Sequence, residues 1–448
     1  MAWTYSLNEL ADAIGAAPVA EDTRFTSVST DTRSLQPGAV FFALSGERFD
    51  GQAFVDKAFE QGAAAAVTRL PVSSGPHIVV ADPLAALQAF AGRHRARLQP
   101  ALFALTGSCG KTTAKEMTAA LLATKRRVVK TPGNLNNEIG CPLSLLQMDA
   151  ATEVAVIEMG ANHPGEIARL CEIARPTESA ITLIAPAHLE GFGTVERVAE
   201  AKGEIVAGLP ADGLFYVNTD DAACVRLAER HPGRIVRFGR SGDVALRRCA
   251  PTSDHNGLHL TIDPIGAITL PLPCRALVTN VLLAVAVALE HGVDTFEEPL
   301  HAVIEAATNR FRVYRKDGVE IIDDTYNANP ASMRAALEAL SQRPARARHA
   351  VLGDMLELGE SAQRLHEEVG ELAGRLGIDR LYLRGDHATH VAEAALRAGV
   401  RHAQVAQEHE ALAALLGAAL RPGDTVLFKG SRGMQMERVI GALRIPGE

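Results

Sequence analysis

The feature that most constrains this chain is a glycine-rich loop that ends in a lysine and two threonines. The loop reads Thr-Gly-Ser-Cys-Gly-Lys-Thr-Thr over residues 106–113. It follows a short apolar run, Ala101–Leu105, and precedes a helix-like stretch, Thr112–Ala123. A strand, a glycine loop and a helix in this order typically bind nucleotide phosphates, because backbone N–H groups and the helix N-terminus face the anion. The loop therefore predicts a nucleotide-binding domain built on a mostly parallel sheet.

The residue types in this loop match the chemistry of a triphosphate. Lys111 is expected to reach the β- and γ-phosphates, and Thr112 to offer its hydroxyl to Mg²⁺. The usual pattern has a glycine where this chain has Leu105, so the loop is a shortened form. Taken alone, the loop leaves a chance glycine turn as the alternative. The expected phosphate-binding residues are Gly107, Ser108, Cys109, Gly110, Lys111, Thr112 and Thr113.

Strand-like and helix-like segments alternate along the chain in three blocks. A length of 448 residues allows two to four domains. The first block contains a turn-rich segment, 26–42, and closes with a helix-like stretch, Pro83–Leu98. The pattern predicts an α/β protein with three domains: a small N-terminal α/β domain at 1–98, a central phosphate-loop domain with a parallel sheet at 99–312, and a C-terminal Rossmann-like α/β domain at 313–448.

Composition excludes several classes of protein. Lys and Arg number 45 against 53 Asp and Glu, and a net charge of −8 argues against a nucleic-acid partner. Six widely spaced cysteines without a CxxC pair suggest neither a zinc site nor a disulfide scaffold. No apolar run reaches the roughly 18 residues that a membrane span needs, and the N-terminus lacks a secretory signal. We therefore expect a cytoplasmic protein without a membrane span.

Two candidate metal ligands follow predicted strands of the central block. Glu158 ends the predicted strand 153–158, and a carboxylate at that end of a parallel strand points into the crevice where ligands bind. It is placed to hold Mg²⁺ or to orient a water molecule. His188 follows the predicted strand Ala180–Ile184 and could join Glu158 as a ligand. A capping carboxylate and an ordinary loop histidine are the alternatives.

Three further loops carry polar side chains suited to anions and hydroxyl groups. They are the amide-rich loop 131–140, the acidic and amide loop 323–330, and the basic glycine turn 429–433. Amide side chains can bind phosphates, carboxylates and sugar hydroxyls without adding charge. Each loop taken alone is also consistent with a simple turn, because Asn and Gly favour turns.

Together these segments resemble the Mur ligase family, the ATP-dependent amide ligases of peptidoglycan precursor synthesis, over essentially the whole chain. The motifs that carry the resemblance, besides the phosphate loop, are Gly133-Asn-Leu-Asn-Asn137, Glu158-Met-Gly-Ala-Asn162, Ala187-His-Leu-Glu-Gly-Phe-Gly193, Ala201-Lys-Gly-Glu204, Tyr326-Asn-Ala-Asn-Pro330 and Gly353-Asp-Met-Leu-Glu-Leu-Gly359. The Asp-Asn-Pro-Arg signature of the members that add a diamino acid is absent from the sequence. The resemblance is greatest to members that use ATP and two Mg²⁺ ions to join D-alanyl-D-alanine to UDP-N-acetylmuramoyl-tripeptide through an acyl phosphate.

The resemblance also implies roles for individual residues. Lys111 would be catalytic, Thr112 and Glu158 would hold one Mg²⁺, and His188 would contribute to the second. Lys202 looks like the lysine that the family carbamylates, and its carbamate would help to hold the second ion. The nucleotide contacts implied are Asn280 for adenine, Arg310 for phosphate and Asp324 for ribose, although Leu283 stands where the family usually has a second asparagine.

The two other substrates have candidate contacts on the same basis. The turn Ser29, Asp31, Thr32 and Arg33 resembles the family's uridine-diphosphate recognition turn, to which Asn134 and Asn137 would add contacts. The C-terminal residues implied for the dipeptide are Tyr326, Asn327, Asn329, Lys429 and Ser431.

Two alternatives to this activity remain open at the level of sequence. One is a sister ligase with another acceptor, of the diamino-acid-adding or folylpolyglutamate type. The other is a nucleotide-dependent regulatory ATPase, which would hydrolyse ATP without an acceptor. We expect a monomer.

Overall fold

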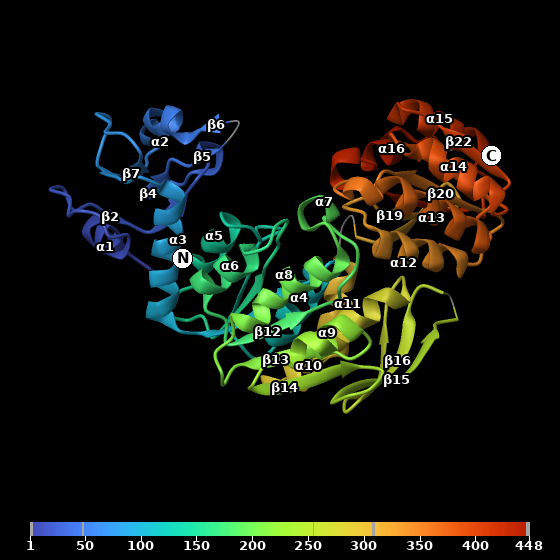
Figure 1. Cartoon of the computed structure of the whole chain (residues 1–448), viewed down its shortest axis with the longest axis horizontal. Helices are drawn as coiled ribbons and strands as arrows, with labels where there is room; N and C mark the ends of the chain where they lie inside the picture. The colour runs from blue at the N-terminus through green and yellow to red at the C-terminus, as the bar shows by residue number, and fades with distance from the viewer. Residues whose placement is uncertain (1–2, 47–48, 254, 307–309, 445–448) are drawn as a thin grey trace.

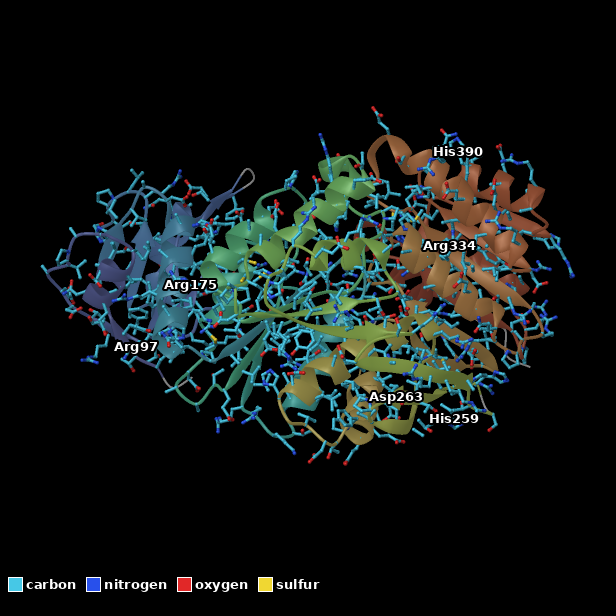
Figure 2. The ribbon with its side chains drawn as sticks, turned by 60° about the horizontal axis from the view of Figure 1, so that its bottom comes forward. Arg97, Arg175, His259, Asp263, Arg334 and His390 are labelled. Carbon is cyan, nitrogen blue, oxygen red and sulfur yellow. The ribbon has the colours of Figure 1, made fainter. Side chains whose placement is uncertain are left out.

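The chain is built around three sheets that follow one another along the sequence. The computed structural model describes residues 3–46, 49–253, 255–306 and 310–444. Both views of the molecule place the central part of the chain between the N-terminal and C-terminal parts (Figures 1 and 2). None of the helices in these ranges is both long enough and apolar enough to cross a membrane.

The N-terminal part contains a parallel four-stranded sheet in the order β3-β4-β7-β8. Its strands are β3 (Ser27–Ser29), β4 (Ala39–Phe42), β7 (Ala65–Thr68) and β8 (His77–Val79). Two antiparallel pairs and two short helices complete it: β1 (Tyr5–Ser6), β2 (Arg24–Phe25), β5 (Ser45–Gly46), β6 (Phe49–Asp50), α1 (Leu7–Ala13) and α2 (Val55–Glu60).

Helix α3 (Pro83–Leu98) links this part to the central sheet and has the predicted bounds. The Asp82 carboxylate accepts hydrogen bonds from the backbone N–H groups of Leu84 and Ala85, so it caps the first turn. Strands β3 and β4 lie in the segment predicted only as turn-rich. That prediction was incomplete because every residue of β4 is buried, so no alternation of polar and apolar residues marks it.

The central sheet has nine strands in the order β10-β11-β9-β12-β13-β14-β15-β16-β17, and only its last two pairings are antiparallel. The strands are β9 (Ala101–Thr106), β10 (Val128–Lys130), β11 (Val154–Glu158), β12 (Glu178–Ile181), β13 (Leu214–Asn218), β14 (Arg234–Gly239), β15 (Val244–Pro251), β16 (Leu258–Asp263) and β17 (Gly266–Leu270). The strand predicted at 180–184 was wrong at both ends, since it runs from 178 to 181.

Helices cover both faces of the central sheet. They are α4 (Lys111–Leu122), α5 (Gly140–Leu145), α6 (Glu166–Ala174), α7 (Leu189–Phe192), α8 (Val195–Ala207), α9 (Ala222–Ala228), α10 (Val278–Glu290) and α11 (Glu297–Glu305). Successive side chains of β9 enter different cores: Phe103 and Leu105 pack on the side of α4 and α10, whereas Leu102 and Ala104 join the core of the other face. This double burial explains why the strands read as continuous apolar runs.

The C-terminal part contains a six-stranded sheet in the order β18-β19-β23-β20-β21-β22, antiparallel only between β18 and β19. Its elements are β18 (Arg312–Lys316), β19 (Val319–Asp324), α12 (Pro330–Ser341), β20 (Arg348–Gly353), α13 (Ala362–Arg375), β21 (Arg380–Arg384), α14 (Ala388–Arg397), β22 (His402–Val405), α15 (His409–Ala419), β23 (Thr425–Lys429) and α16 (Glu437–Ala442). Residues of α12, α13 and α14 share one core with the sheet, and residues of α15 and α16 share the other.

The carboxyl ends of strands from the central and C-terminal sheets face each other. Figure 1 shows the C-terminal part lying beside the central part, next to α7 and α11. Glu158 ends β11, Asp324 ends β19 and Lys429 ends β23. Residues of the amide-rich loop, which follows β10, lie in one region with the loop after β19 and with Lys429. The domain boundaries at 98 and 312 stay predictions.

Candidate active site

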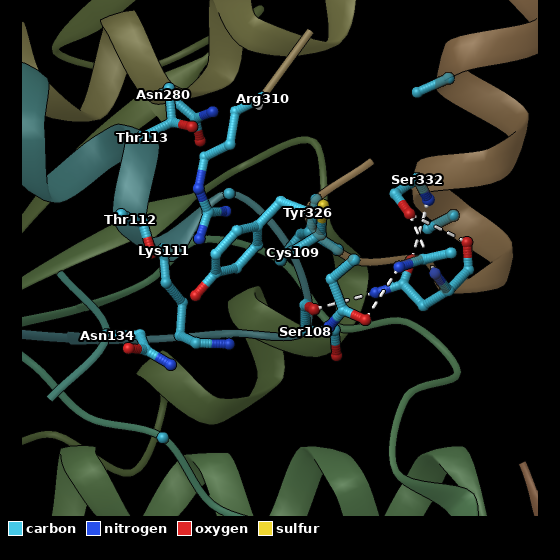
Figure 3. A pocket seen from close by; sticks show the side chains of 18 of the residues that line it. Ser108, Cys109, Lys111, Thr112, Thr113, Asn134, Asn280, Arg310, Tyr326 and Ser332 are labelled. Atoms are coloured by element: carbon cyan, nitrogen blue, oxygen red, sulfur yellow. Dashed lines mark hydrogen bonds between the residues drawn. The ribbon is translucent and has the colours of Figure 1, made fainter. Parts of the chain in front are cut away.

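A cavity of about 400 Å³ lies where the two sheets face each other. The central part contributes the phosphate loop, the amide-rich loop and the end of β11, and the C-terminal part contributes the loop after β19 and the end of β23. Of the predicted site residues, those that line the cavity are Ser108, Cys109, Gly110, Lys111, Thr112, Thr113, Asn134, Asn137, Glu158, His188, Asn280, Arg310, Asp324, Tyr326, Asn327, Asn329 and Lys429. Figure 3 shows Lys111, Asn134, Arg310 and Tyr326 extending into the same space.

The phosphate loop takes its shape from two glycines in a conformation that other residues rarely adopt. Gly107 has φ 146°, and a Cβ there would lie 1.9 Å from Thr182 Oγ1. Gly110 has φ 83°, and a Cβ there would lie 2.5 Å from Asn280 Oδ1. Ser108 Oγ donates to the carbonyl of Ala185 at 2.8 Å, which fixes the loop to the segment after β12. The loop is therefore packed closely against the protein on this side.

Lys111 opens α4 and folds back over the loop. Its ammonium donates to the carbonyl of Gly107 at 2.8 Å. Burial lowers the pKa of Lys111, and the nearby Glu158 carboxylate opposes that shift. A lysine in this position can move its three N–H donors onto phosphate oxygens.

Thr112 and Glu158 form the pair that sequence reasoning assigned to Mg²⁺. Thr112 Oγ1 donates to Glu158 Oε2 at 2.9 Å, and Asn136 Nδ2 donates to Glu158 Oε1 at 2.7 Å. No group of three or more His, Cys, Asp or Glu side chains suited to a metal occurs within the described ranges. The hydroxyl and single carboxylate fit Mg²⁺, which commonly binds one or two carboxylates together with phosphate oxygens and water.

His188 is turned toward the C-terminal part of the chain. It has φ 53°, just before α7, and its Nδ1 makes a hydrogen bond with Glu357 Oε2. Glu357 has φ 62°, and the hydrogen bond with His188 lowers its pKa. The backbone N–H of Glu190 also donates to the carbonyl of Glu357 at 3.1 Å. These contacts join the motif 187–193 to the motif 353–359 across the two parts of the molecule.

Lys202 lies on α8 and is only 1% exposed. Burial lowers its pKa to about 7, and the positive charge of Lys111 contributes to the shift. Its ammonium lies 5.7 Å from the centroid of the Phe192 ring. Lys202 is not among the residues that line the cavity. The uncharged amine that such a pKa makes available near neutral pH is the form that reacts with carbon dioxide.

The predicted nucleotide contacts on the C-terminal side are paired with protein groups. The guanidinium carbon of Arg310 lies 3.8 Å from the centroid of the Tyr326 ring, a cation–π distance. Lys429 Nζ lies 2.5 Å from Asp324 Oδ2 and donates to the carbonyl of Asn327 at 2.9 Å. Burial raises the pKa of Asp324, and Lys429 opposes the shift.

Asn280 lies on α10, and its side chain is close to Gly110 of the phosphate loop. Leu283, at the position of the missing second asparagine, is buried in the core around α10. That position therefore offers no polar contact to a ligand.

Two of the loop residues predicted for the dipeptide have evident structural roles. Asn329 caps α12 through Ser332, and its Nδ2 donates to the carbonyl of Ser108 at 3.0 Å. Ser431 is buried, and its Oγ accepts from the N–H of Leu356 at 2.8 Å. Asn329 thus connects the C-terminal part directly to the phosphate loop.

The turn predicted for uridine diphosphate lies on the N-terminal sheet, away from the residues that line the cavity. Ser29 ends β3, and Thr32, which is buried, starts a short 3-10 helix (Thr32–Ser34). The Asp31 carboxylate accepts from the side chain of Arg33, which lowers the pKa of Asp31 to about 2. The Arg33 side chain is 85% exposed, so its outer face is accessible.

Sequence reasoning missed three residues that organise the site. Asn136 lies in the amide-rich loop but was not singled out, although it contacts Glu158. Lys115 is fully buried behind the phosphate loop, and its spacing of four residues from Lys111 on one helix was the available signal. Glu357 is 169 residues from His188 in the sequence, and no local pattern connects the two.

Comparisons with known proteins find similarity over nearly the whole chain. Residues 24–93 match the catalytic domain of the Mur ligase family, residues 105–288 the Mur ligase middle domain, and residues 309–432 the Mur ligase glutamate ligase domain. The UDP-N-acetylmuramoyl-tripeptide–D-alanyl-D-alanine ligase of Escherichia coli (strain K12) is 37% identical over 453 residues, covering 99% of each chain.

Two solved structures have the same three-domain fold. A crystal structure of MurF from Acinetobacter baumannii superposes with a TM-score of 0.89 at 32% identity, covering 98% of this chain and 99% of that one. MurF ligase from Thermotoga maritima in complex with ADP superposes with a TM-score of 0.83 at 32% identity, covering 93% and 96%. The predicted three-domain α/β fold is confirmed, and the chain belongs to the Mur ligase family.

Proposed function

We propose that this chain joins D-alanyl-D-alanine to UDP-N-acetylmuramoyl-tripeptide with ATP, giving the UDP-linked pentapeptide precursor of peptidoglycan. The observation that carries the proposal is a single cavity lined by a phosphate loop with Lys111, a carboxylate at Glu158 and amide loops from both sheets. Full-length similarity to ligases with this name supports it. ADP in the Thermotoga maritima relative supports nucleotide use.

The reaction we propose begins with activation of a carboxylate. The C-terminal carboxylate of the tripeptide takes the γ-phosphoryl group of ATP, which releases ADP and gives an acyl phosphate. The free amine of D-alanyl-D-alanine attacks the acyl carbon, and the tetrahedral intermediate loses inorganic phosphate and a proton to leave an amide. Phosphorylation is needed because a carboxylate is a poor acyl donor.

The chain's own residues supply the charge stabilisation. Lys111 would leave the Gly107 carbonyl and donate to the phosphate oxygens on which charge develops. Thr112 and Glu158 would hold a Mg²⁺ ion, whose charge offsets repulsion between the triphosphate and the acceptor carboxylate. We further propose that Lys202 is carbamylated and, with His188, helps to hold a second ion; its lowered pKa supports this.

The three domains would divide the substrates. Ser29, Asp31, Thr32 and Arg33 would hold the uridine diphosphate, with Asn134 and Asn137 nearer the cavity. Tyr326, Asn327 and Lys429 would face the dipeptide, while Asn329 and Ser431 hold the loops that carry them. Contact between the domains would keep water from the acyl phosphate. Such a chain would act in the cytoplasm as a monomer.

A coupled assay of ADP release tests the activity. We expect ADP release that requires both UDP-N-acetylmuramoyl-tripeptide and D-alanyl-D-alanine. Release without an acceptor would support a regulatory ATPase, and release with a diamino acid or a glutamate acceptor in place of the dipeptide would support a sister ligase. Either result would refute the proposal.

Lys111→Ala is the matched variant for this assay. It removes the donor to the phosphates, and we expect substrate-dependent ADP release to fall by about three orders of magnitude or more, because the lost interactions form in the transition state. Near-normal turnover in this variant would contradict the proposed mechanism.

A further inference from the structure

Lys115 is a buried cation that the proposed reaction does not use. It lies on α4, one helical turn after Lys111, with its side chain 0% exposed. Its ammonium donates to the carbonyl oxygens of Thr131 and Gly133 at 2.7 and 2.8 Å. It does not line the cavity formed by the described residues.

The ammonium of Lys115 also has two carboxylate neighbours. Glu116 Oε1 lies at 3.0 Å and Glu158 Oε2 at 3.8 Å. A buried lysine is costly unless its charge is paired and its N–H groups are hydrogen-bonded. A side chain required only to fill space under α4 could be apolar, so the charge and donors of Lys115 have another use.

The two carbonyls that Lys115 binds belong to the start of the amide-rich loop. Thr131 Oγ1 accepts from the backbone N–H of Glu158 at 3.0 Å, so the start of the loop is fixed to the end of β11. The loop returns to Glu158 through Asn136, and the N–H of Gly160 donates to the carbonyl of Asn136 at 2.8 Å. Lys115, this loop and Glu158 therefore form one connected set of polar contacts.

Close packing leaves the loop little room to adopt another path. A Cβ at Gly140 would lie 2.4 Å from the backbone of Leu135, and one at Gly160 would lie 2.8 Å from Asn136 Oδ1. The same set of contacts reaches the phosphate loop through the hydrogen bond from Thr112 to Glu158. A displacement of α4 would be passed to the loop through Lys115.

We propose that Lys115 is a positioning residue that holds the amide-rich loop, residues 131–140, in register with the phosphate-loop helix. Lys115 acts through the loop and through Glu158, not on a reacting atom. This role rests on the proposed function. In it, Lys115 couples the nucleotide end of the site to the wall that receives the UDP-linked substrate.

Two substitutions test this role. Lys115→Met removes both the charge and the donors from the two carbonyls, and Lys115→Gln keeps an amide with two N–H donors but no charge. Lys130→Met is the matched control, because Lys130 is a partly exposed lysine that pairs with the same Glu116 carboxylate from outside. Measurements are hydrogen–deuterium exchange, ADP binding by calorimetry, and steady-state kinetics of all four proteins.

For Lys115→Met we expect exchange of the 131–140 backbone amides to rise about 10-fold or more, with KM for the UDP-linked substrate rising about 10-fold, because two buried carbonyls lose their donor. ADP affinity should change less than about 3-fold, since Lys111 and the glycine loop are intact. Lys115→Gln should restore most of the exchange protection. Lys130→Met should match the wild type in every measurement.

Several results would overturn the inference. One is unchanged exchange at 131–140 and unchanged KM in both variants. Another is a rise in exchange spread evenly over the central sheet with loss of ADP binding in both variants, which would make Lys115 a residue of general stability. If Lys115→Met fails to fold, Lys115→Ala, which removes the same charge and the same donors to the Thr131 and Gly133 carbonyls, takes its place in the test. Exchange and ADP binding need no peptide substrate, so they decide the role of Lys115 even if the proposed ligase activity is wrong.

Discussion

Glu158 is the residue on which the polar contacts of the central half of the cavity converge. It accepts from Thr112 and Asn136 and lies within 3.8 Å of Lys115. Its side chain is almost fully buried at the end of β11. A carboxylate so surrounded by donors is held in one orientation, as a metal ligand must be.

Glu158→Gln removes the negative charge while keeping the size of the side chain. We expect kcat to fall by about 100-fold, because electrostatic groups at a reacting centre contribute that much, and the Mg²⁺ requirement to rise. ADP release over a Mg²⁺ titration measures both. Glu153→Gln, which changes an exposed carboxylate just before the same strand, should stay within about 2-fold of wild type; equal losses in the two variants would contradict the assignment.

Lys202 gives the chain a pH dependence of stability with a defined sign. Burial lowers its pKa from 10.5 to about 7. Between these values the unfolded chain binds a proton that the folded chain does not. The contribution of Lys202 to stability therefore rises with pH and is least favourable below about pH 7. In buffer free of carbon dioxide, the free energy of unfolding of the wild type should rise by up to about 1.4 kcal/mol per pH unit relative to that of Lys202→Met between pH 7 and pH 10.

Thermal or urea unfolding of the two proteins across this pH range measures the gain. A constant difference in the free energy of unfolding would mean that the pKa of Lys202 is near its ordinary value in the folded protein. The carbamate proposal would then lose its physical support.

At the scale of single elements, α12 connects the C-terminal sheet to the phosphate loop through the residue that caps it. The carbonyl oxygen of the Asn329 side chain accepts from the N–H of Ser332 at 2.8 Å, which caps the helix. The amide of the same side chain donates to the carbonyl of Ser108. The Asn329 side chain therefore both caps α12 and joins this helix to the phosphate loop.

Asn329→Ser separates these purposes, because serine caps a helix about as well as asparagine but is too short to reach Ser108. We expect the free energy of unfolding to change by less than about 1 kcal/mol while kcat/KM for ATP falls about 10-fold, the value of one buried hydrogen bond at the site. Asn329→Ala should show the same kinetic loss with an added loss of stability. Equal kinetics for Asn329→Ser and wild type would show that the contact with Ser108 is dispensable.

The sequence predicted elements best where a local signal marks both ends. Helix α3 has an Asp cap and a proline at its start, and a proline follows its end at Pro100, so its bounds were predicted correctly. The predicted strand was extended to Ile184 because the apolar Leu183 and Ile184 follow shortly after Ile181, where the strand ends. They form instead the loop against which Ser108 packs, with its N–H donating to Leu183 O at 2.9 Å. Apolarity alone cannot separate a strand from a segment that supports a ligand loop.

Some residues of the candidate site could likewise be predicted from local sequence patterns, and others could not. Lys111 and Thr112 follow from the strand–loop–helix pattern, and Glu158 follows from its place at the end of a predicted parallel strand. The pairings Lys429 with Asp324 and His188 with Glu357 join residues 105 and 169 positions apart. They depend on the topology of the C-terminal sheet and on how the domains meet, which no short motif encodes.

At the scale of the whole molecule, the pair His188 and Glu357 lies between the central and C-terminal domains. The two side chains are 27% and 53% exposed, so the pair adds little to the stability of the fold. Its value is in orientation: a carboxylate on one ring nitrogen of a histidine directs the other nitrogen. Contact between the domains would in this way set the geometry of the proposed metal ligand.

Glu357→Gln tests this dependence. We expect the melting temperature to change by less than about 2 °C, kcat to fall about 10-fold, and the radius of gyration from X-ray scattering in the presence of ATP to increase. Glu360→Gln alters another exposed carboxylate in the adjoining 3-10 helix (Gly359–Ser361) and serves as the control. A kcat equal to wild type in Glu357→Gln would show that domain contact does not act through this carboxylate.

The cations that face the cavity already have partners within the protein. Lys111 donates to the Gly107 carbonyl, Lys429 pairs with Asp324, and Arg310 lies on the Tyr326 ring. Binding of the proposed anionic substrates at these cations would therefore be an exchange reaction, in which each bond to a ligand replaces a bond within the protein, and the heat released on binding should be small for such charged ligands. Selectivity among anions then depends on how well a ligand's oxygen atoms substitute for a carbonyl, a carboxylate and an aromatic face in three fixed positions. This is how a chain of net charge −8 can choose one polyanion without attracting others.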